Sequence, residues 1–256
     1  MYEGIRVSVV TVTKNCAPSL ARTLDSVAAQ DYGNIEHVII DGKSTDGTWE
    51  EIRRREDALR ARLGGRLLTL SEEDGGISDA FNKGVARSTG DIVLLLNAGD
   101  TFASSSSART AAADFERAGR PGVLYYRVQV GRSSLMPGGD DDREIWESCQ
   151  VPHQGAFVSR ETYRRIGGYD TALKLRMDLD FFARCRAGGV THRFIPKTIA
   201  RYETGGASMQ LPNARRFYEE GLSVMRRHGL PVTLADRAQP LVPNCVRRLV
   251  RLFIKR

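Results

Sequence analysis

The segment GDIVLLLNAGD, residues 90–100, joins a run of apolar residues to a polar end. Residues 92–96 are all apolar, as is typical of a strand buried on both faces of a parallel sheet. The run stops at Asn97, and Gly99 and Asp100 follow it. Ligands of open parallel sheets bind beyond the carboxyl ends of the strands. The segment therefore predicts a buried strand with an amide and a carboxylate at its carboxyl end, where a ligand would bind. The simpler alternative is that residues 97–100 form an ordinary turn.

The segments on both sides of this strand alternate between the periodicities of strands and of helices. Strand patterns cover residues 5–13, 37–41, 66–70, 92–96 and 123–130, with a short one at 191–196. Helical patterns begin at Pro18 and cover residues 48–63, 78–86, 108–118, 160–166, 177–187 and 213–228. Residues 133–142 are rich in Gly and Asp and predict a loop. The alternation predicts an α/β fold whose mostly parallel sheet is flanked by helices.

The composition is typical of a globular protein, with 41% apolar and 27% charged residues among 256. This length suits one large domain, or one domain with a substantial C-terminal extension. No apolar run reaches the ~20 residues that a membrane-spanning helix needs, and no signal peptide is expected from the N-terminal sequence. The four cysteines are far apart in sequence, which predicts free thiols in a reducing cytoplasm.

The net charge of +7 is carried by residues 201–256, because the acidic and basic residues of the preceding chain balance. A basic segment on a neutral body indicates an anionic partner, either membrane phospholipid or nucleic acid. Within this segment Val246, Leu249, Val250 and Phe253 follow helical spacing among basic residues. The pattern predicts a helix lying on an anionic membrane surface, or a terminal helix packed on its own domain.

Acidic residues follow three strands of the predicted sheet. Asp41 ends the second strand, Glu72, Glu73 and Asp74 follow the third, and Asp100 follows the fourth. Carboxylates gathered at one edge repel each other unless a cation or hydrogen-bond donors compensate them. Mg²⁺ is commonly held by one or two carboxylates together with phosphate oxygens of a ligand. The edge is therefore a candidate site for a divalent cation and a phosphate, although a single Asp after a strand is usually a cap or turn residue.

Two other nucleotide-binding motifs are absent. The sequence GKS at residues 42–44 lacks the earlier glycine of a phosphate-binding P-loop, because His37 stands at that position. The glycine pattern GxGxxG of dinucleotide-binding folds does not occur. The sequence therefore supports neither a P-loop nucleotidase nor a dinucleotide-dependent dehydrogenase.

Several ordered blocks of the sequence resemble family 2 glycosyltransferases. The first blocks are SVVTVTKN, LARTLDSVAAQDYGNIEHVIIDGKSTDGT and EEDGGISDAFNKGVARSTGDIVLLLNAGDTF. The later blocks, PHQGAFVSRETYRRIGGYD, RMDLDFFARC and GGAS, are similar to those of bacterial members that build exopolysaccharide or O-antigen. The resemblance covers roughly residues 5–208, so it is specific for the family but not for the sugar that is moved.

The resemblance implies a Rossmann-like GT-A fold, a nucleotide-sugar donor such as a UDP-sugar, a divalent Mn²⁺ or Mg²⁺, and inversion at the anomeric carbon. It also implies a glycan or polyprenyl-diphosphate-linked acceptor, and no nucleic-acid partner. We accordingly expect a cytoplasmic enzyme of surface polysaccharide synthesis, peripheral on the inner face of the cell membrane. Residues 1–210 are the expected transferase domain, with a nucleotide half of about residues 1–102 and an acceptor half of about 103–210. Residues 211–256 are the expected basic helical extension.

The family motifs also assign roles to residues of this chain. The residues expected to bind the nucleotide sugar are Thr11, Lys14, Asp41, Asp74, Asp79, Asn97 and Asp100. Asp100 matches the ligand of the metal and the diphosphate, and Asp178 matches the catalytic base. The common family pattern has acidic residues where this chain has Asn97 and Gly99, which leaves the metal one strand-end carboxylate. Asn97 can still form a hydrogen bond with a ribose or a phosphate.

Glycosyl transfer needs a base that takes the proton of the acceptor hydroxyl. Asp178 and Asp180 lie two residues apart near the start of a predicted helix, so at most one of them is expected to face the acceptor. The other carboxylate would be stabilised by the positive N-terminal end of the helix dipole. The spacing cannot choose between them, and the resemblance favours Asp178.

Two further stretches are open to two interpretations each. His153 in PHQ is expected to contact the acceptor or the diphosphate, or to be a structural hydrogen-bonding residue. Gly205, Gly206 and Ser208 of GGAS either offer backbone N–H groups to a phosphate or form an ordinary turn.

Two alternative functions remain open from the sequence. A sugar-1-phosphate nucleotidyltransferase also binds nucleotides on an α/β sheet, but it needs a Gly-rich loop that VTKNCAPS lacks. A non-enzymatic protein that binds membranes or nucleic acid through its basic C-terminal segment would ignore nucleotide sugars and bind polyanions with a steep salt dependence.

Overall fold

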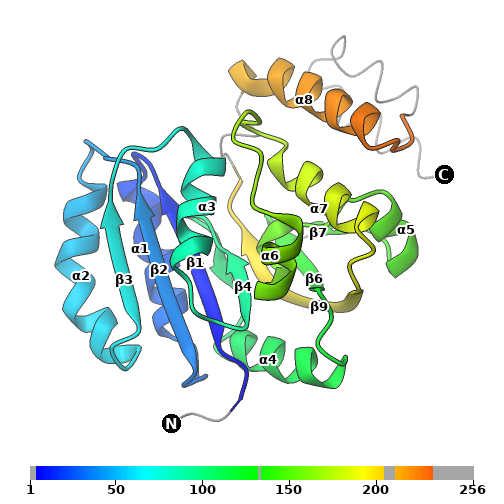
Figure 1. Cartoon of the computed structure of the whole chain (residues 1–256). Helices are drawn as coiled ribbons and strands as arrows, with labels where there is room; N and C mark the ends of the chain where they lie inside the picture. Colours follow the sequence, from blue (N-terminus) through cyan, green and yellow to red (C-terminus); the bar gives the residue numbers. More distant parts are fainter. Residues whose placement is uncertain (1–3, 132–133, 205–210, 233–256) are drawn as a thin grey trace.

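The computed structural model describes residues 4–131, 134–204 and 211–232, whose strands form one sheet flanked by helices (Figure 1). The strands are β1 (Val7–Thr13), β2 (Ile35–Asp41), β3 (Leu67–Ser71), β4 (Ile92–Leu95), β5 (Thr101–Phe102), β6 (Val123–Val130), β7 (Ser134–Met136), β8 (Ala156–Ser159) and β9 (His192–Tyr202). The helices are α1 (Ala17–Ala28), α2 (Thr48–Arg62), α3 (Ile77–Arg87), α4 (Ser107–Arg117), α5 (Asp142–Glu147), α6 (Arg160–Ile166), α7 (Met177–Ala187) and α8 (Ala214–Arg227). Short 3₁₀ turns are η1 (His153–Gly155) and η3 (Leu211–Asn213). The predicted α/β class is confirmed.

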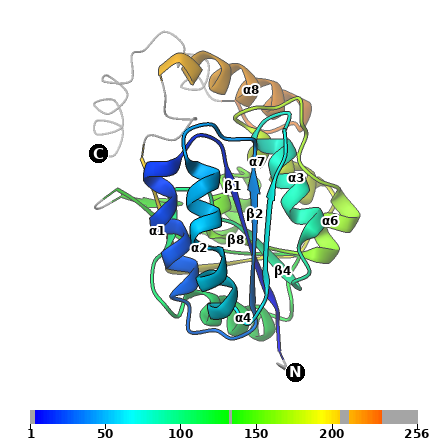
Figure 2. The same ribbon diagram turned by 90° about the vertical axis from the view of Figure 1, so that its left-hand side faces the viewer.

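The first half of the sheet is parallel and buried on both faces. Strands β3, β2, β1 and β4 lie side by side in parallel register. Val7 and Val9 of β1 belong to the apolar cluster that includes α1, α2 and α4, whereas Val10 and Val12 belong to the cluster that includes α3 and α7. Figure 2 shows these layers, with α1 and α2 on one side of the strands and α3 and α6 on the other. Burial on both faces explains the continuous apolar run at residues 92–96.

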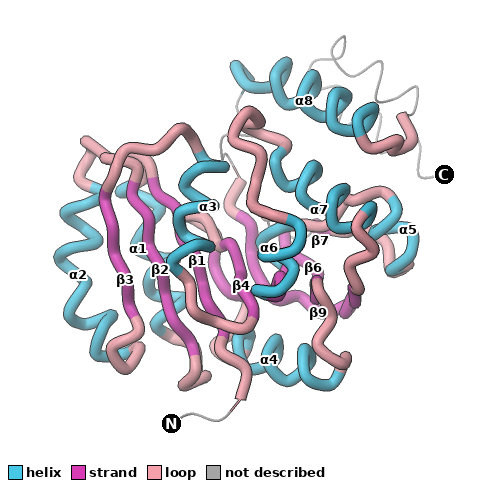
Figure 3. The backbone as a smooth tube through the Cα atoms, in the orientation of Figure 1, coloured by secondary structure: helices cyan, strands magenta, loops and turns pink. Residues whose placement is uncertain are grey.

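The second half of the sheet contains the antiparallel pairs. Strand β8 lies antiparallel between β4 and β6, and β5 lies antiparallel to β9. Figure 3 shows β6, β7 and β9 of this half as magenta strands. Strand β8, helix α5 and η1 are not predicted from the sequence, and residues 134–136 form β7 inside the segment expected to be a loop. The short strand expected at residues 191–196 continues to Tyr202, because a bulge in the pairing with β6 accommodates Pro196.

Strands β1, β2, β3 and β4 finish at the same edge of the sheet, and α8 lies beyond that end of the molecule in both Figures 1 and 2. Helix α8 packs on α7 and lies within residues 211–256, the expected helical extension. The apolar and basic positions expected at residues 246–256 lie outside the described residues. Within the described ranges, no helix has both the length and the apolarity needed to cross a bilayer.

Candidate active site

Asp41 holds the ends of three strands together. Its carboxylate is fully buried and accepts hydrogen bonds from the hydroxyls of Thr13 at 3.0 Å, Ser44 at 2.5 Å and Ser71 at 2.7 Å. Burial alone raises the pKa of Asp41, but the hydrogen bonds from Ser44, Ser71 and Thr13 outweigh it and lower the pKa. A nucleotide sugar that bonded to Asp41 would compete with these hydroxyls, so the expected contact of Asp41 with the nucleotide sugar stays a prediction.

Thr11 lies inside the sheet and not at its edge. The side chain is fully buried, and its hydroxyl lies 2.9 Å from Nε2 of His37 on β2. Burial lowers the pKa of His37 to about 3, so this imidazole is neutral at physiological pH. The structure therefore does not bring Thr11 to the surface on which the other expected site residues gather.

Lys14 and Asp74 meet at Gly42. The ammonium group of Lys14 donates hydrogen bonds to the carbonyl oxygens of Gly42 and Lys43. A Cβ on Gly42 would lie 2.1 Å from Oδ2 of Asp74 and 3.2 Å from Cδ of Lys14. The glycine therefore leaves the room in which these two side chains approach each other beyond β1 and β2.

Asp74 and Asp79 shape the loop between β3 and α3. Oδ1 of Asp74 accepts the N–H of Gly76 at 2.8 Å, and Oδ2 of Asp79 accepts the N–H of Gly75 at 2.9 Å. The Gly75 N–H, together with Lys83 at 3.0 Å, lowers the pKa of Asp79. Both carboxylates thus support the loop itself.

The turn after β4 carries two buried oxygen atoms that have no hydrogen-bond partner in the described part of the chain. Gly99 has φ +104°, a conformation that favours glycine, and it closes a turn in which the Asp100 N–H donates to the Asn97 carbonyl at 2.9 Å. Oδ1 of Asp100 accepts the N–H of Glu203 at 2.9 Å. Among the described residues, Oδ2 of Asp100 and Oδ1 of Asn97 are buried and accept no hydrogen bond.

The environment of Asp100 disfavours its charge. Its carboxylate is only 3% exposed, and burial raises its pKa to about 6. The Glu203 N–H, His153 and the nearby side chain of Gln154 act in the opposite direction but do not outweigh burial. A buried carboxylate of this kind is stabilised by a cation or by donors from a ligand. The two orphaned oxygens of Asp100 and Asn97 therefore fit a hard divalent cation, which prefers oxygen ligands.

The described residues do not form a complete metal cage. Across those ranges, no group of three or more His, Cys, Asp or Glu side chains is arranged to hold a metal ion. One carboxylate and one amide oxygen are enough for a cation that takes its remaining ligands from water and phosphate. The donor set of Asn97 and Asp100 is consistent with that mode of binding.

His153 connects the turn after β4 to helix α7. Its Nε2 lies 3.2 Å from Nδ2 of Asn97, and its Nδ1 lies 3.6 Å from Oδ2 of Asp178. Because the amide Nδ2 of Asn97 can only donate, Nε2 accepts and Nδ1 carries the proton toward Asp178. His153 therefore brings together two residues that sequence reasoning placed in separate motifs.

Asp178 and Asp180 face different surroundings, as expected from their spacing. The side chain of Asp178 is 28% exposed; burial acts to raise its pKa, but the hydrogen bond from His153 and the charge of Arg176 lower it overall. Asp180 is buried and pairs with Arg184 at 2.8 Å and His228 at 2.9 Å. Asp178 is thus an ionised carboxylate open to a ligand, while Asp180 belongs to an internal network.

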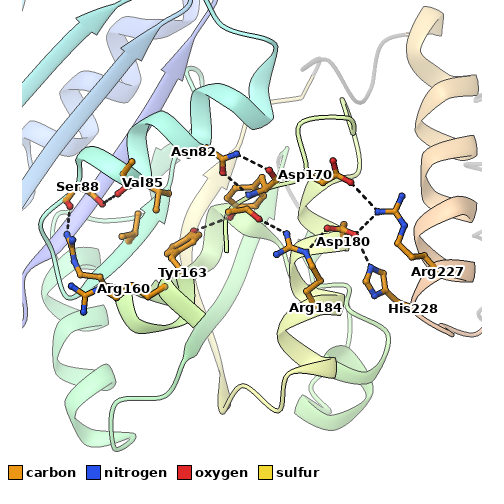
Figure 4. A pocket seen from close by; sticks show the side chains of 15 residues that line it. Asn82, Val85, Ser88, Arg160, Tyr163, Asp170, Asp180, Arg184, Arg227 and His228 are labelled. Carbon is orange, nitrogen blue, oxygen red and sulfur yellow. Dashed lines mark hydrogen bonds and ion pairs between the residues drawn. The ribbon is translucent and has the colours of Figure 1, made fainter. Parts of the chain in front are cut away.

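A cavity of about 680 Å³ lies between α3, α6, α7 and the end of α8, and Asp180 is among the residues that line it. Its polar groups satisfy one another, for example the hydroxyls of Tyr163 and Tyr169 at 3.1 Å, and Arg227 with Asp170 at 3.1 Å (Figure 4). None of Asp41, Asp100 or Asp178 lines it. The cavity is therefore not the site that the strand-end residues form.

The structure also adds residues that the sequence did not indicate. Glu203 supplies the N–H that Asp100 accepts, and Arg176 lies close enough to Asp178 to lower its pKa. Arg176 opens the block RMDLDFFARC, but neither residue was given a role from the sequence, because both act through positions that only the folded chain brings together. Gly205, Gly206 and Ser208 lie outside the described residues.

Comparisons with known proteins give a consistent result. The model of the family described as glycosyl transferase family 2 matches residues 8–135. A PGL/p-HBAD biosynthesis glycosyltransferase of Mycobacterium tuberculosis is 33% identical over 207 residues, which cover 78% of each chain. An uncharacterized glycosyltransferase of the same species is 32% identical over 190 residues, covering 72% of this chain and 70% of the relative.

Solved structures share the fold at lower identity. The complex of S. aureus TarS 1–349 with UDP-GlcNAc has a TM-score of 0.71 at 19% identity, over 88% of this chain and 65% of that one. The mannosyltransferase PcManGT of Pyrobaculum calidifontis, in complex with GDP-Man and Mn²⁺, has a TM-score of 0.70 at 22% identity, over 93% of this chain and 68% of that one. These likenesses confirm the expected GT-A type of fold.

Proposed function

The chain belongs to glycosyl transferase family 2, and we propose that it moves a sugar from a nucleotide-diphosphate sugar to an acceptor hydroxyl with inversion of the anomeric carbon. The observation that carries the proposal is the connection from Asn97 through His153 to Asp178. It joins the strand-end turn, where a diphosphate would bind, to an ionised carboxylate on a later helix. A single-displacement reaction needs a binding site for the leaving diphosphate and a base for the acceptor hydroxyl in the same active site.

In this proposal Asp178 is the general base. Its carboxylate is ionised because His153 and Arg176 lower its pKa against the effect of burial. The carboxylate of Asp178, whose side chain is 28% exposed, accepts the proton of the acceptor hydroxyl while the hydroxyl oxygen attacks the sugar. His153 holds the carboxylate in place through its Nδ1–H.

The turn after β4 is the proposed diphosphate site. Oδ2 of Asp100 and Oδ1 of Asn97 would hold a Mn²⁺ or Mg²⁺ ion, which when bound stabilises the negative charge of the leaving nucleotide diphosphate. Lys14, Asp41, Asp74 and Asp79 surround the adjoining strand ends and are the proposed contacts of the nucleotide and sugar. Thr11 would support this edge from inside the sheet.

The substrates and the location are proposed on the resemblance and the comparisons. UDP-sugar is the favoured donor, because TarS was solved with UDP-GlcNAc, although PcManGT was solved with GDP-Man. The proposed acceptor is a glycan or a polyprenyl-diphosphate-linked sugar of a bacterial surface polysaccharide. The basic residues 211–256 would then hold a cytoplasmic transferase domain, residues 1–210, at the inner face of the membrane.

A thermal-shift screen tests the donor. UDP-, GDP- and dTDP-sugars are compared with and without Mn²⁺, and the cognate donor is expected to raise Tm most when the cation is present. Failure of every nucleotide sugar to raise Tm would contradict the proposal. Release of pyrophosphate from a nucleoside triphosphate and a sugar phosphate would indicate a nucleotidyltransferase instead.

A further inference from the structure

Helix α8 holds the start of α7 through one carboxylate. Oε2 of Glu220 accepts the N–H groups of Lys174 at 3.1 Å, Leu175 at 2.8 Å and Arg176 at 3.1 Å, and Oε1 accepts that of Lys174 at 3.0 Å. These N–H groups immediately precede α7, whose N-cap residue Arg176 makes no capping hydrogen bond with its side chain. Glu220 therefore supplies the anion that this helix end favours.

The same face of α8 also holds the side chain of Arg176. The guanidinium carbon of Arg176 lies 4.5 Å from the centre of the Phe217 ring. A Cβ on Gly221 would lie 3.4 Å from Nε of Arg176, so this guanidinium passes closely over the glycine. Residues 217, 220 and 221 are neighbours on one helix face. One face of α8 thus binds both the backbone and the side chain of the residue before α7.

The segment held in this way reaches both parts of the site. Arg176 precedes Asp178 by two residues, and its charge helps to lower the pKa of that carboxylate. Nζ of Lys174 donates to the carbonyl oxygen of Gly75 at 2.6 Å, in the loop that Asp74 and Asp79 shape. Residues 174–176 therefore connect α8, the glycine loop and the first turn of α7.

We propose that Glu220 and Phe217 are positioning residues for Asp178, so that α8 belongs to the catalytic unit and is more than a link to the basic C-terminal segment. The inference rests on the proposed role of Asp178 as the base. Glu220 fixes the place of the first turn of α7, and Phe217 keeps Arg176 beside the carboxylate. Neither residue touches the donor in this proposal.

The first test compares substitutions of two adjacent glutamates. Glu220→Ala removes the acceptor of the three N–H groups, Glu220→Gln keeps one acceptor oxygen, and Glu219→Ala is the matched control. Glu219 is exposed and pairs with Arg215 on its own helix at 2.7 Å. We expect kcat to fall about 10- to 100-fold in Glu220→Ala, less in Glu220→Gln, and to stay unchanged in Glu219→Ala. The rise in Tm caused by the donor should be the same in all three.

The second test uses the pH profile of kcat. The titratable and charged groups that face Asp178 are His153, Arg176 and Tyr169. Phe217→Leu removes the ring that holds Arg176 near Asp178. The pKa of Asp178 should then rise, and the acid limb of the profile should move to higher pH. Phe217→Tyr keeps an aromatic ring, so its acid limb should stay at the pH of the parent protein. A purely structural role of Phe217 would lower Tm without moving that limb.

The outcomes separate this inference from the proposed function. Equal kcat values in Glu220→Ala and Glu219→Ala would overturn the positioning role. A lower kcat in Glu220→Ala would also overturn it if the donor no longer raised the Tm of that variant. If Asp178→Asn keeps full turnover, the base assignment itself fails. A fall of kcat in Glu220→Ala with donor stabilisation intact, together with an inactive Asp178→Asn, supports both.

Discussion

Nδ1 of His153 lies 3.6 Å from Oδ2 of Asp178, while the opposite ring nitrogen of His153 faces Asn97. One imidazole thus spans the gap between the turn after β4 and the first turn of α7. In the proposed reaction the diphosphate leaves at the turn after β4, and Asp178 takes the proton of the acceptor. One imidazole ring separates the two groups that would do this.

The Asp178→Asn substitution removes the proposed base and leaves the shape of the site almost unchanged. We expect kcat to fall by about 10²- to 10⁴-fold, because the amide cannot accept the proton of the acceptor hydroxyl. Donor binding, measured by thermal shift, should be retained. Asp180→Asn is the matched control: it breaks contacts with Arg184 and His228, so it should lower Tm without a comparable effect on the kcat of folded protein. Normal turnover in Asp178→Asn would disprove the assignment.

The His153→Ala substitution removes the connection but leaves the base in place. Without the interaction with His153 the pKa of Asp178 should rise, so the acid limb of the kcat profile should move to higher pH. Asp178 remains ionised at neutral pH, where kcat should fall by about tenfold because the carboxylate is no longer held in place. His192, which stacks on Trp146 at 4.2 Å, provides the control variant His192→Ala. An unchanged pH profile in His153→Ala would show that His153 does not influence the base.

The pH dependence of stability distinguishes Asp100 from Asp180. Burial in the folded protein raises the pKa of Asp100 to about 6. Below this pH the carboxyl is protonated and does not destabilise the fold. As pH rises through 6 it becomes ionised, and the buried charge lowers the stability of the folded state. In the absence of divalent cations, Asp100→Asn should therefore raise Tm by several degrees at pH 8 and have a much smaller effect at pH 4. The free-energy difference is on the order of 2 to 3 kcal/mol.

Asp180 should show the opposite behaviour in the same experiment. Hydrogen bonds from His228 and Arg184 lower its pKa against the effect of burial, so its contribution is present above the ordinary pKa of an aspartate and is lost only in strong acid. Asp180→Asn should lower Tm throughout the range from pH 5 to 8. A Tm of Asp100→Asn that follows that of the parent protein at every pH would contradict the raised pKa of Asp100.

The Gly84→Ala substitution tests how closely α3 packs on the sheet. Alanine favours a helix over glycine by about 1 kcal/mol, but a Cβ at this position would lie 2.2 Å from Cγ1 of Val10. Overpacking of a core costs about 1 to 3 kcal/mol, so the net effect should be a lower Tm. Gly139→Ala, where a Cβ meets no atom within 4 Å, is the control and should leave Tm almost unchanged. A higher Tm in Gly84→Ala would show that α3 moves away from β1 at little cost.

The order of helices and strands in the first half of the chain was predictable, because it depends on local periodicity. Strands β1 to β4 and helices α1 to α4 lie close to the predicted segments. The second half was less predictable. Strand β8 is short and is stabilised by antiparallel pairing with β4 and β6, and β9 continues beyond Pro196 because a bulge accommodates the proline. Neither feature leaves a periodic signal in the sequence.

The sequence by itself determined that an α/β sheet presents acidic and amide groups at one edge, because alternating apolar segments fix the strands and the residues that follow them. Only the tertiary structure decided what each group does. Asp41, Asp100, Asp178 and Asp180 are the same residue type, yet burial without a paired cation raises the pKa of Asp100, whereas hydrogen bonds and nearby charges lower those of the others. These effects depend on distances between segments far apart in the chain, and such distances are set by packing and not by local sequence.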